Sequence, residues 1–377
     1  FNDSIIFNNR PTYVSNSLDS TSYQFQNLKE GKYLIIALKD IDNNYFFDPF
    51  YDKIGFIDSL ITLPKDSIID FKLFKEETAL IWDKPHFINS EKIGFGYYGK
   101  LNIKNIEIES SLPDSVQYTF TKESEKDTLV FWLSRNSFDS LNFNLIEKDT
   151  TKLVTVKFDR ARDTLIDSLS ISPKTANVIH LRETFKLSSN IPLIKIRDSL
   201  ITIRDIDSLI VPFTTSISDN LDEVDIEFEV SPSDSYRVSI LPEAIKDIRG
   251  VINDTLEYNV VSQSLEDYGN VYLDVIRNSE SKFILHMIDN NGDIIREFKN
   301  VTQNSTYNFD YIRPGKYRFR LIEDSNNNDI WDTGNYLRKI KPEPVYYFLN
   351  ELEVRANWDF NETFDLNNKL IIKDSIN

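Results

Sequence analysis

The stretch Gly315–Asp332, GKYRFRLIEDSNNNDIWD, has a counterpart near the other end of the chain, Gly31–Asp48, GKYLIIALKDIDNNYFFD. The two stretches align at a constant offset of 284 residues, which also pairs Tyr23 with Tyr307 upstream. A pattern that recurs at a fixed offset is the signature of a duplicated structural unit. The sequence therefore predicts two copies of one module, one at each end of the chain.

Each copy reads as two strands joined by a turn. The first strand alternates aromatic and polar residues, which is typical of a strand with one buried face. The turn closes on a glycine, and the second strand runs directly into an acidic loop. The predicted strands are Tyr23–Phe25 and Tyr33–Leu38 in the first copy, and Tyr307–Phe309 and Tyr317–Ile322 in the second.

The acidic loops carry oxygen-bearing side chains at positions 1, 3, 5 and 9. These are Asp40, Asp42, Asn44 and Asp48 in the first loop, and Asp324, Asn326, Asn328 and Asp332 in the second. This spacing lets a short loop surround a hard cation with oxygens, so we predict that the eight residues bind calcium. The loops depart from an EF-hand loop, because position 6 is Tyr45 or Asp329 and position 12 is Tyr51 or Asn335. The alternative is a polar turn in which Asp and Asn side chains cap their own backbone.

The composition excludes several classes of function. The chain of 377 residues has 60 acidic and 43 basic residues and a net charge of −17, which disfavours binding to nucleic acid or to an anionic membrane surface. It contains no cysteine, so it has neither disulfides nor thiolate ligands. No apolar run approaches the roughly 20 residues of a membrane helix.

The beginning of the chain is unusual. Phe1 is not an initiator methionine, and no signal peptide follows it. In the second copy Tyr307 lies 38 residues after Gly269, whereas Tyr23 lies 22 residues after Phe1. We therefore expect about 16 residues of the first module, together with targeting information, to lie upstream.

The periodicity predicts an all-β protein, a string of four antiparallel β-sandwiches. Short alternating runs separated by turn residues indicate sandwiches, and no connection is long enough for a parallel crossover. The expected domains are residues 1–76, 77–163, 164–265 and 266–377. Among the expected strands are Lys92–Tyr98, Leu101–Ile108, Val116–Phe120, Thr128–Leu133, Leu141–Leu145, Leu153–Phe158, Ser235–Leu241 and Thr255–Val261.

No residues form a recognisable catalytic constellation. His86, His180 and His286 stand far apart and are predicted to be structural, and the common nucleophile, phosphate-binding and zinc motifs are missing from the sequence. We expect a protein that is not an enzyme. Three of the four tryptophans, Trp82, Trp132 and Trp358, are predicted to be core residues. Trp331 lies inside the second acidic loop, where it either plugs the end of the sandwich or offers a contact surface; we favour the plug.

Several segments resemble known families. YNFDYIRPGKYRFRL resembles transthyretin-like or carboxypeptidase-regulatory sandwiches, and residues 169–264, with SSNIP and LPEAIKD, resemble SbsA-type Ig-like domains. The order of the modules, with GNYLRKIKPE and EVRANWDFNETFDL, is similar to an Ig-like domain-containing lipoprotein family of Bacteroidota. Together these resemblances imply that the outer two domains, 1–76 and 266–377, are transthyretin-like and that the inner two, 77–163 and 164–265, are Ig-like. The resemblance to the lipoprotein family also implies a further Ig-like domain and a lipidated cysteine upstream, and a place at the outer membrane.

These observations predict a cell-surface scaffold. We expect a lipid-anchored subunit of an outer-membrane protein complex, such as barrel-assembly or secretion machinery, whose partners are outer-membrane proteins. Contact with the membrane would occur only through the upstream anchor. A glycan-binding or adhesive surface module is the alternative, and a hydrolase with two carboxylates in a cleft is a third possibility.

Overall fold

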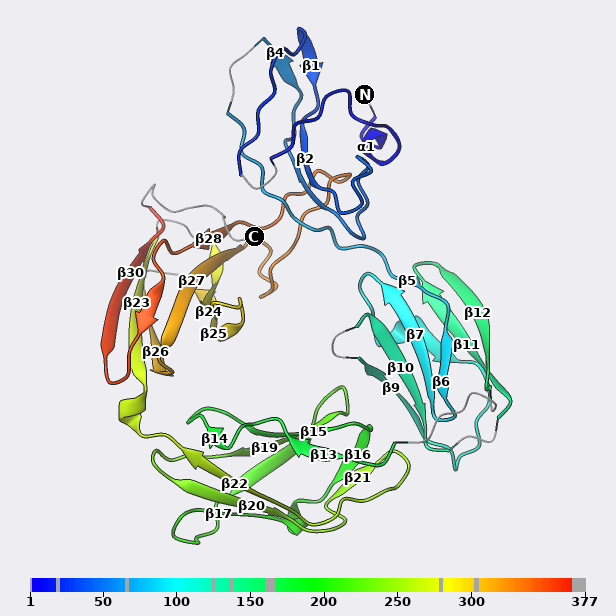
Figure 1. Cartoon of the computed structure of the whole chain (residues 1–377), viewed down its shortest axis with the longest axis vertical. Coiled ribbons are helices and arrows are strands. Elements are labelled where there is room, and N and C mark those ends of the chain that lie inside the picture. The colour runs from blue at the N-terminus through cyan, green and yellow to red at the C-terminus, as the bar shows by residue number, and fades with distance from the viewer. Residues whose placement is uncertain are drawn as a thin grey trace. The chain divides into compact units, whose positions relative to one another are not determined.

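The chain is an all-β protein of β-sandwich domains, as predicted. The expectation of purely antiparallel pairing is wrong, because Asn270–Ile276 pairs in parallel with Asp359–Asp365, and Val178–Ile179 with Val261–Ser262. A computed structural model describes residues 2–17, 21–64, 68–123, 126–135, 138–159, 167–277, 281–301 and 305–367. The chain divides into two compact units (Figure 1): Phe1–Thr78 with Gly269–Asn377, and Ala79–Tyr268. The expected boundary at residues 163 and 164 lies outside the described residues. Within the described part, no helix is both long and apolar enough to cross a membrane.

The first sandwich of the Ala79–Tyr268 unit closes around three edge-to-face phenylalanines. Phe95 and Phe131 lie 4.9 and 5.0 Å from the ring of Phe143, and all three are fully buried. One sheet contains β5 (Ile81–Trp82), β6 (His86–Asn89), β7 (Lys92–Tyr98), β9 (Tyr118–Lys122) and β10 (Thr128–Leu133). The other contains β8 (Ile106–Ile108), β11 (Ser140–Glu147) and β12 (Thr150–Lys157).

Two sequence expectations for this sandwich are wrong in detail. The strand expected over Leu101–Ile108 begins only at Ile106, because Asn102 caps a 3₁₀ turn at Ile103–Asn105 by accepting from the Lys104 N–H. Asn and Asp side chains compete for backbone groups in this way at turns. The strand expected over Val116–Phe120 instead spans Tyr118–Lys122.

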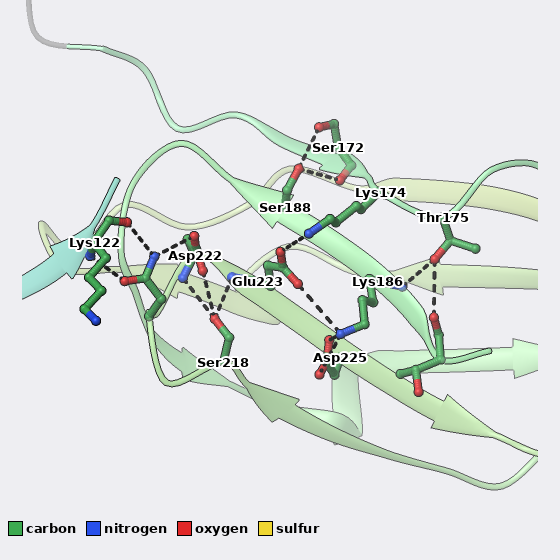
Figure 2. Close-up of polar contacts among 12 residues, drawn as sticks. Lys122, Ser172, Lys174, Thr175, Lys186, Ser188, Ser218, Asp222, Glu223 and Asp225 are labelled. Atoms are coloured by element: carbon green, nitrogen blue, oxygen red, sulfur yellow. Dashed lines mark hydrogen bonds and ion pairs between the residues drawn. The ribbon is translucent and has the colours of Figure 1, made fainter. Parts of the chain in front are cut away.

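The second sandwich of this unit pairs two four-stranded sheets. One contains β13 (Ile171–Pro173), β15 (Phe185–Ser189), β18 (Phe213–Ile217) and β19 (Glu223–Phe228). The other contains β14 (Val178–Ile179), β17 (Ile201–Arg204), β20 (Ser235–Ile240) and β22 (Leu256–Ser262), and β16 (Leu193–Ile196) pairs with β21 (Ile245–Asp247) beside them. Figure 2 shows a polar row over β15 and β19, where Lys174 and Lys186 reach Glu223 and Asp225. These lysines are exposed, so the row adds little stability.

The two sandwiches of this unit are joined by an apolar cluster and a side-chain amide. Val130 and Trp132 of the first sandwich pack with Ile191 and Ile248 of the second, and all four are buried. At a separate point, the Asn220 side chain accepts from the Lys122 N–H at 2.6 Å and donates to the Lys122 carbonyl at 3.0 Å (Figure 2). The amide thus pairs with the end of β9 as a neighbouring strand would.

Buried charges reinforce the same joint. Arg249 donates to Asp247 at 2.8 Å and to the Asp167 carbonyl at 2.8 Å, and it lies 3.6 Å from Glu91 across the joint. The Asp247 side chain is completely buried. Burial raises the pKa of the Glu91 carboxyl against the opposing effect of Arg249. Lys92 stacks over the Trp132 ring at 4.3 Å.

We predict that Arg249→Met lowers the free energy of unfolding by about 3–5 kcal/mol, because it leaves the buried Asp247 carboxylate without its counter-ion. Urea denaturation of the full chain measures this. Arg197→Met is the matched control, since the Arg197–Glu243 pair is exposed at 45% and 60% and should contribute less than about 1 kcal/mol. Equal effects of the two substitutions would contradict a stabilising buried pair of Arg249 and Asp247.

The other unit contains the two end modules. The C-terminal one has a sheet of β23 (Gly269–Ile276), β26 (Ser305–Ile312) and β30 (Asp359–Asp365). It faces β24 (Lys282–Asp289), β25 (Ile294–Val301), β27 (Gly315–Asp324), β28 (Val345–Tyr347) and β29 (Leu352–Val354). The Asp289–Asp293 segment forms a hairpin turn, since the Asp289 N–H bonds to the Asp293 carbonyl at 3.0 Å.

The N-terminal module contains α1 (Ile5–Asn8) and two short antiparallel pairs. β1 (Gly31–Tyr33) pairs with β4 (Ile61–Leu63), and β2 (Ile36–Lys39) pairs with β3 (Lys53–Phe56). The strand expected at Tyr23–Phe25 is wrong, because this segment has no strand partner. Instead the Tyr23 hydroxyl donates to the Ile69 carbonyl, and its ring packs against Phe71.

A buried histidine lies within the C-terminal module. Arg320 Nε donates to His286 Nδ1 at 3.0 Å, so Nε2 carries the proton and donates to Glu297 at 2.8 Å. Burial lowers the pKa of His286, and Arg320 adds to this, while the bond to Glu297 opposes it. His286 is thus buried and held between Arg320 and Glu297.

The depressed pKa of His286 has a consequence for stability. The folded state binds a proton at lower pH than the unfolded state, whose histidine titrates near 6.5. The contribution of neutral His286 to the free energy of unfolding is therefore present above pH 6.5. It is lost as the pH falls below that value, because the unfolded state then binds more protons. We expect thermal melts between pH 7 and 5 to show a shallower loss of melting temperature for His286→Gln than for the wild type. The exposed His86→Gln is the control, and an unchanged slope for His286→Gln would contradict this assignment.

Candidate functional site

The strands on either side of each acidic loop pair with equivalent partners in the two modules. Gly31 pairs with Leu63 in the first module and Gly315 with Val354 in the second. Leu38 pairs with Ile54, and Ile322 with Val345. The offset between the copies is thus 284 before the loop and 291 after it, so the second copy carries seven additional residues at this point.

The first six residues of both loops share two unusual backbone positions and the same hydrogen bonds to position 1. Positions 4 and 6 have positive φ in each, at 55° and 66° for Asn43 and Tyr45, and at 60° and 62° for Asn327 and Asp329. The residue at position 1 holds this turn in place. Asp40 accepts from the N–H groups of positions 5 and 6, and Asp324 does the same. The side chain at position 5 accepts from the N–H of position 7 in both copies.

A second carboxylate closes each loop, and the sequence analysis missed it. Asp52 accepts from the N–H groups of Ile41 at 2.9 Å and Asp48 at 2.8 Å. Glu343 accepts from the equivalent N–H groups of Ser325 and Asp332 at 2.7 and 3.1 Å. Asp52 and Glu343 correspond once the seven-residue difference is included, and a search that allowed an insertion would have paired them.

The predicted calcium ligands converge more closely in the second loop. Asn326 and Asn328 both donate to Asp332 Oδ2, the latter at 2.7 Å, while Asp324 is buried at the base of the loop. In the first loop Asp48 accepts from the Phe50 N–H and Asp42 is exposed. The structure thus joins Asn326, Asn328 and Asp332 directly through side chains, and Asp324 through the Asn328 backbone.

The donor set has the chemistry that calcium requires, namely carboxylate and amide oxygens. Burial raises the pKa of Glu343, the N–H groups of Asp332 and Ser325 oppose this, and the neighbouring carboxylates of Asp332 and Asp324 add to it. This accumulation of negative charge would favour a cation. In the described part of the chain, no group of three or more His, Asp or Glu side chains is arranged to hold a metal. A site here would therefore depend on the amide oxygens, and the self-capped turn remains the alternative.

The large residue at position 8 differs between the loops. Phe47 is a buried core residue at 2% exposure, whereas Trp331 is 42% exposed and donates to the Glu343 carbonyl at 3.1 Å. The plug expected for Trp331 is therefore wrong, because its indole lies on the loop surface. Trp82 and Trp132 are core residues, but Trp358 is 56% exposed beside Arg355, so the prediction for Trp358 is wrong as well.

The seven-residue insertion of the second loop contacts the N-terminal module. Tyr336 is fully buried and packs against Phe56, with ring centroids 5.4 Å apart. Its N–H donates to the carboxylate of Glu76, and burial raises the pKa of Glu76 against this bond. The Thr333 hydroxyl donates to the Lys75 carbonyl at 2.6 Å. The sequence analysis assigned no role to this segment.

No family model and no curated protein matches the chain. Similar solved structures include the native alpha-2-macroglobulin of Escherichia coli, at 11% identity over 51% of this chain and 96% of that chain, with a TM-score of 0.23. The major pilin subunit of Bacillus cereus is 13% identical over 67% and 89%, with a TM-score of 0.19. A protein of the mixed-linkage glucan utilization locus of Bacteroides ovatus, solved with a mixed-linkage heptasaccharide, is 12% identical over 79% and 81%, with a TM-score of 0.20. Sequence identities and TM-scores this low give no information about function.

Calcium binding stays a prediction, and calorimetry tests it directly. We expect millimolar calcium to give a binding heat and to raise the melting temperature of the wild type, because a ligand of the native state stabilises it. Asp324→Ala combined with Asp332→Ala should remove the effect of the second loop. The matched control is Asp289→Ala, in an acidic hairpin turn outside both loops. Indistinguishable heats for the wild type and the double variant would reject the site.

Proposed function

We propose that the chain is a non-enzymatic interaction scaffold of the cell envelope. It would be a lipid-anchored subunit of an outer-membrane protein complex that holds a partner at fixed geometry. The observation that carries this proposal is the joint between the two sandwiches of the Ala79–Tyr268 unit. An apolar cluster, a side-chain amide bridge and a buried arginine all connect the two sandwiches there.

Such a joint favours a spacer over a flexible linker. Interfaces between domains of one chain are usually small and polar, and relative motion is the normal expectation. Here Trp132 and Ile248 are buried between the sandwiches, and Arg249 of the second sandwich lies 3.6 Å from Glu91 of the first, with the two side chains 11% and 10% exposed. Bending the joint would expose apolar side chains and separate buried charges, and both changes cost free energy.

The described surface also supports a role without catalysis. A polar hollow of about 220 Å³ lies beside Asp114, Gln117 and Arg249, and Asp114 is the one carboxylate among its lining residues. Glycoside hydrolysis needs a pair of carboxylates flanking the bond. Arg249 is already engaged by Asp247 in this hollow, so its charge serves the joint.

Co-purification tests the proposal. We expect the protein, extracted from envelopes in mild detergent, to bring down the same outer-membrane protein or proteins in a fixed ratio, because a scaffold is recovered with what it holds. The complex should weaken when Arg249→Met loosens the joint and persist with the exposed control Arg197→Met.

Recovery of the protein alone would contradict the scaffold. Glycan binding is the second candidate, favoured by the exposed indoles of Trp331 and Trp358. A glycan-array signal that Trp331→Ala or Trp358→Ala abolishes would favour that function instead.

A further inference from the structure

The insertion in the second acidic loop is not needed to close that loop. In the first copy Asp52 closes the loop four residues after Asp48, whereas in the second copy Glu343 makes the same two bonds eleven residues after Asp332. The strands on either side keep the same register in both copies. The seven residues Gly334–Ile340 are therefore additional to the fold of their own module.

The insertion is an internally closed turn. The Asn335 and Ile340 backbones exchange two hydrogen bonds, at 2.7 and 2.9 Å, and the Lys339 N–H bonds to the Tyr336 carbonyl at 3.1 Å. The Asn335 side chain accepts from the Arg338 N–H at 2.9 Å. The turn thus holds Tyr336 and Lys339 in a fixed arrangement before any contact is made, which lowers the entropy cost of binding.

The apolar contacts of this turn lie in the N-terminal module. Tyr336 completes the cluster formed by Phe47, Ile54, Phe56 and Phe74. Gly334 approaches so closely that a Cβ atom there would lie 2.7 Å from the Phe74 ring. The same Cβ atom would lie 2.6 Å from the Ile340 carbonyl oxygen, so glycine is favoured both by the closure of the turn and by the contact with Phe74.

Charge complementarity surrounds the aromatic contact. Lys339 lies 3.9 Å above the Tyr336 ring, 5.7 Å from Phe56 and 2.8 Å from Asp3. Lys341 pairs with Asp58 at 2.8 Å. The inserted segment thus contributes the basic side chains, and the N-terminal module contributes the acidic ones. Such charge complementarity is typical of a segment bound in a recognition site.

We propose that the N-terminal module contains a peptide-binding site, and that residues 333–341 are its intrachain ligand. The site recognises a turn that carries an aromatic residue followed by a lysine three positions later, with glycine two positions before the aromatic residue. A peptide of this chemistry can occupy the site when the intrachain segment is withdrawn. The proposal does not depend on the scaffold function.

One detail separates recognition of the ring from recognition of the hydroxyl. The Tyr336 hydroxyl is buried and has no hydrogen-bond partner among the described residues. A buried hydroxyl without a partner costs free energy. Phenylalanine in place of Tyr336 should therefore bind at least as tightly as tyrosine.

The test uses the full chain lacking Gly334–Ile340, which gives the second loop the length of the first. The probe is a fluorescent synthetic peptide with the sequence of residues 332–342, followed by fluorescence anisotropy. We expect saturable binding to the deletion variant and at least tenfold weaker binding to the wild type, whose site is filled. The Tyr336→Ala peptide should bind at least tenfold more weakly. The Tyr336→Phe peptide should bind equally or better, and the Leu337→Ala peptide should be unchanged because Leu337 is 54% exposed.

A second variant protects the test against loss of the module's fold. The double variant Lys339→Gln with Lys341→Gln leaves Tyr336 in place but removes both ion pairs. We expect its affinity for the peptide to lie between those of the deletion variant and the wild type. Equal binding of the Tyr336→Ala and Leu337→Ala peptides would overturn the proposal. Unfolding of the N-terminal module in both variants, seen by hydrogen exchange, would also overturn it, because the segment would then be part of that module's core. Wild-type dimers that the peptide dissociates would support it, with a second copy of the chain filling the site.

Discussion

Both end modules depend on one constraint, the pairing of backbone N–H groups where a strand turns into an acidic loop. An N–H group that leaves a sheet must find another acceptor, or it costs free energy when water is excluded. Asp40 and Asp324 supply that acceptor at the start of each loop, and Asp52 and Glu343 supply it across the base. Once these hydrogen bonds are made, the number of residues between the loop and its closing carboxylate does not change how the flanking strands pair. This explains how seven residues were accommodated without a change of register.

The sequence could predict what is local and periodic. The strands Lys92–Tyr98 and Thr128–Leu133 have the predicted bounds, because alternation over six or seven residues specifies a face unambiguously. The duplication was visible because Gly31 and Gly315 precede strands of the same pattern. The Tyr23–Phe25 strand failed for a complementary reason. Its alternation matches that of Tyr307–Phe309, but a strand requires a partner, and only the second copy supplies one, in β23.

The contacts that define the candidate sites were hidden from the sequence. Glu343 lies eleven residues beyond Asp332, outside any fixed-spacing motif, and its role emerges only when the copies are compared across the insertion. Tyr336 and Glu76 are separated by 260 residues, and neither has a pattern that indicates burial against the other. Trp358 shows the opposite error, since a tryptophan beside a strand was taken to be core, although its indole stacks on Phe360 at the exposed end of β30. Long-range packing decides such positions, and composition does not specify it.

The chain uses two different chemistries to connect its parts. The joint at Trp132 and Arg249 combines an apolar cluster with the Arg249–Glu91 pair, whose side chains are 11% and 10% exposed and therefore little screened by salt. The Tyr336 contact instead places an uncharged ring among aromatic residues, and its ion pairs, Lys339–Asp3 and Lys341–Asp58, are half-exposed and screened by salt. Glu76 lacks a cationic partner among its hydrogen bonds and accepts only backbone and amide N–H groups of the turn, so burial raises its pKa. A carboxylate with a raised pKa opposes the contact when ionised, and this opposition diminishes as the pH falls toward that pKa. The two connections therefore differ in their sensitivity to salt, whereas each contains a carboxyl group, Glu91 or Glu76, whose pKa is raised by burial.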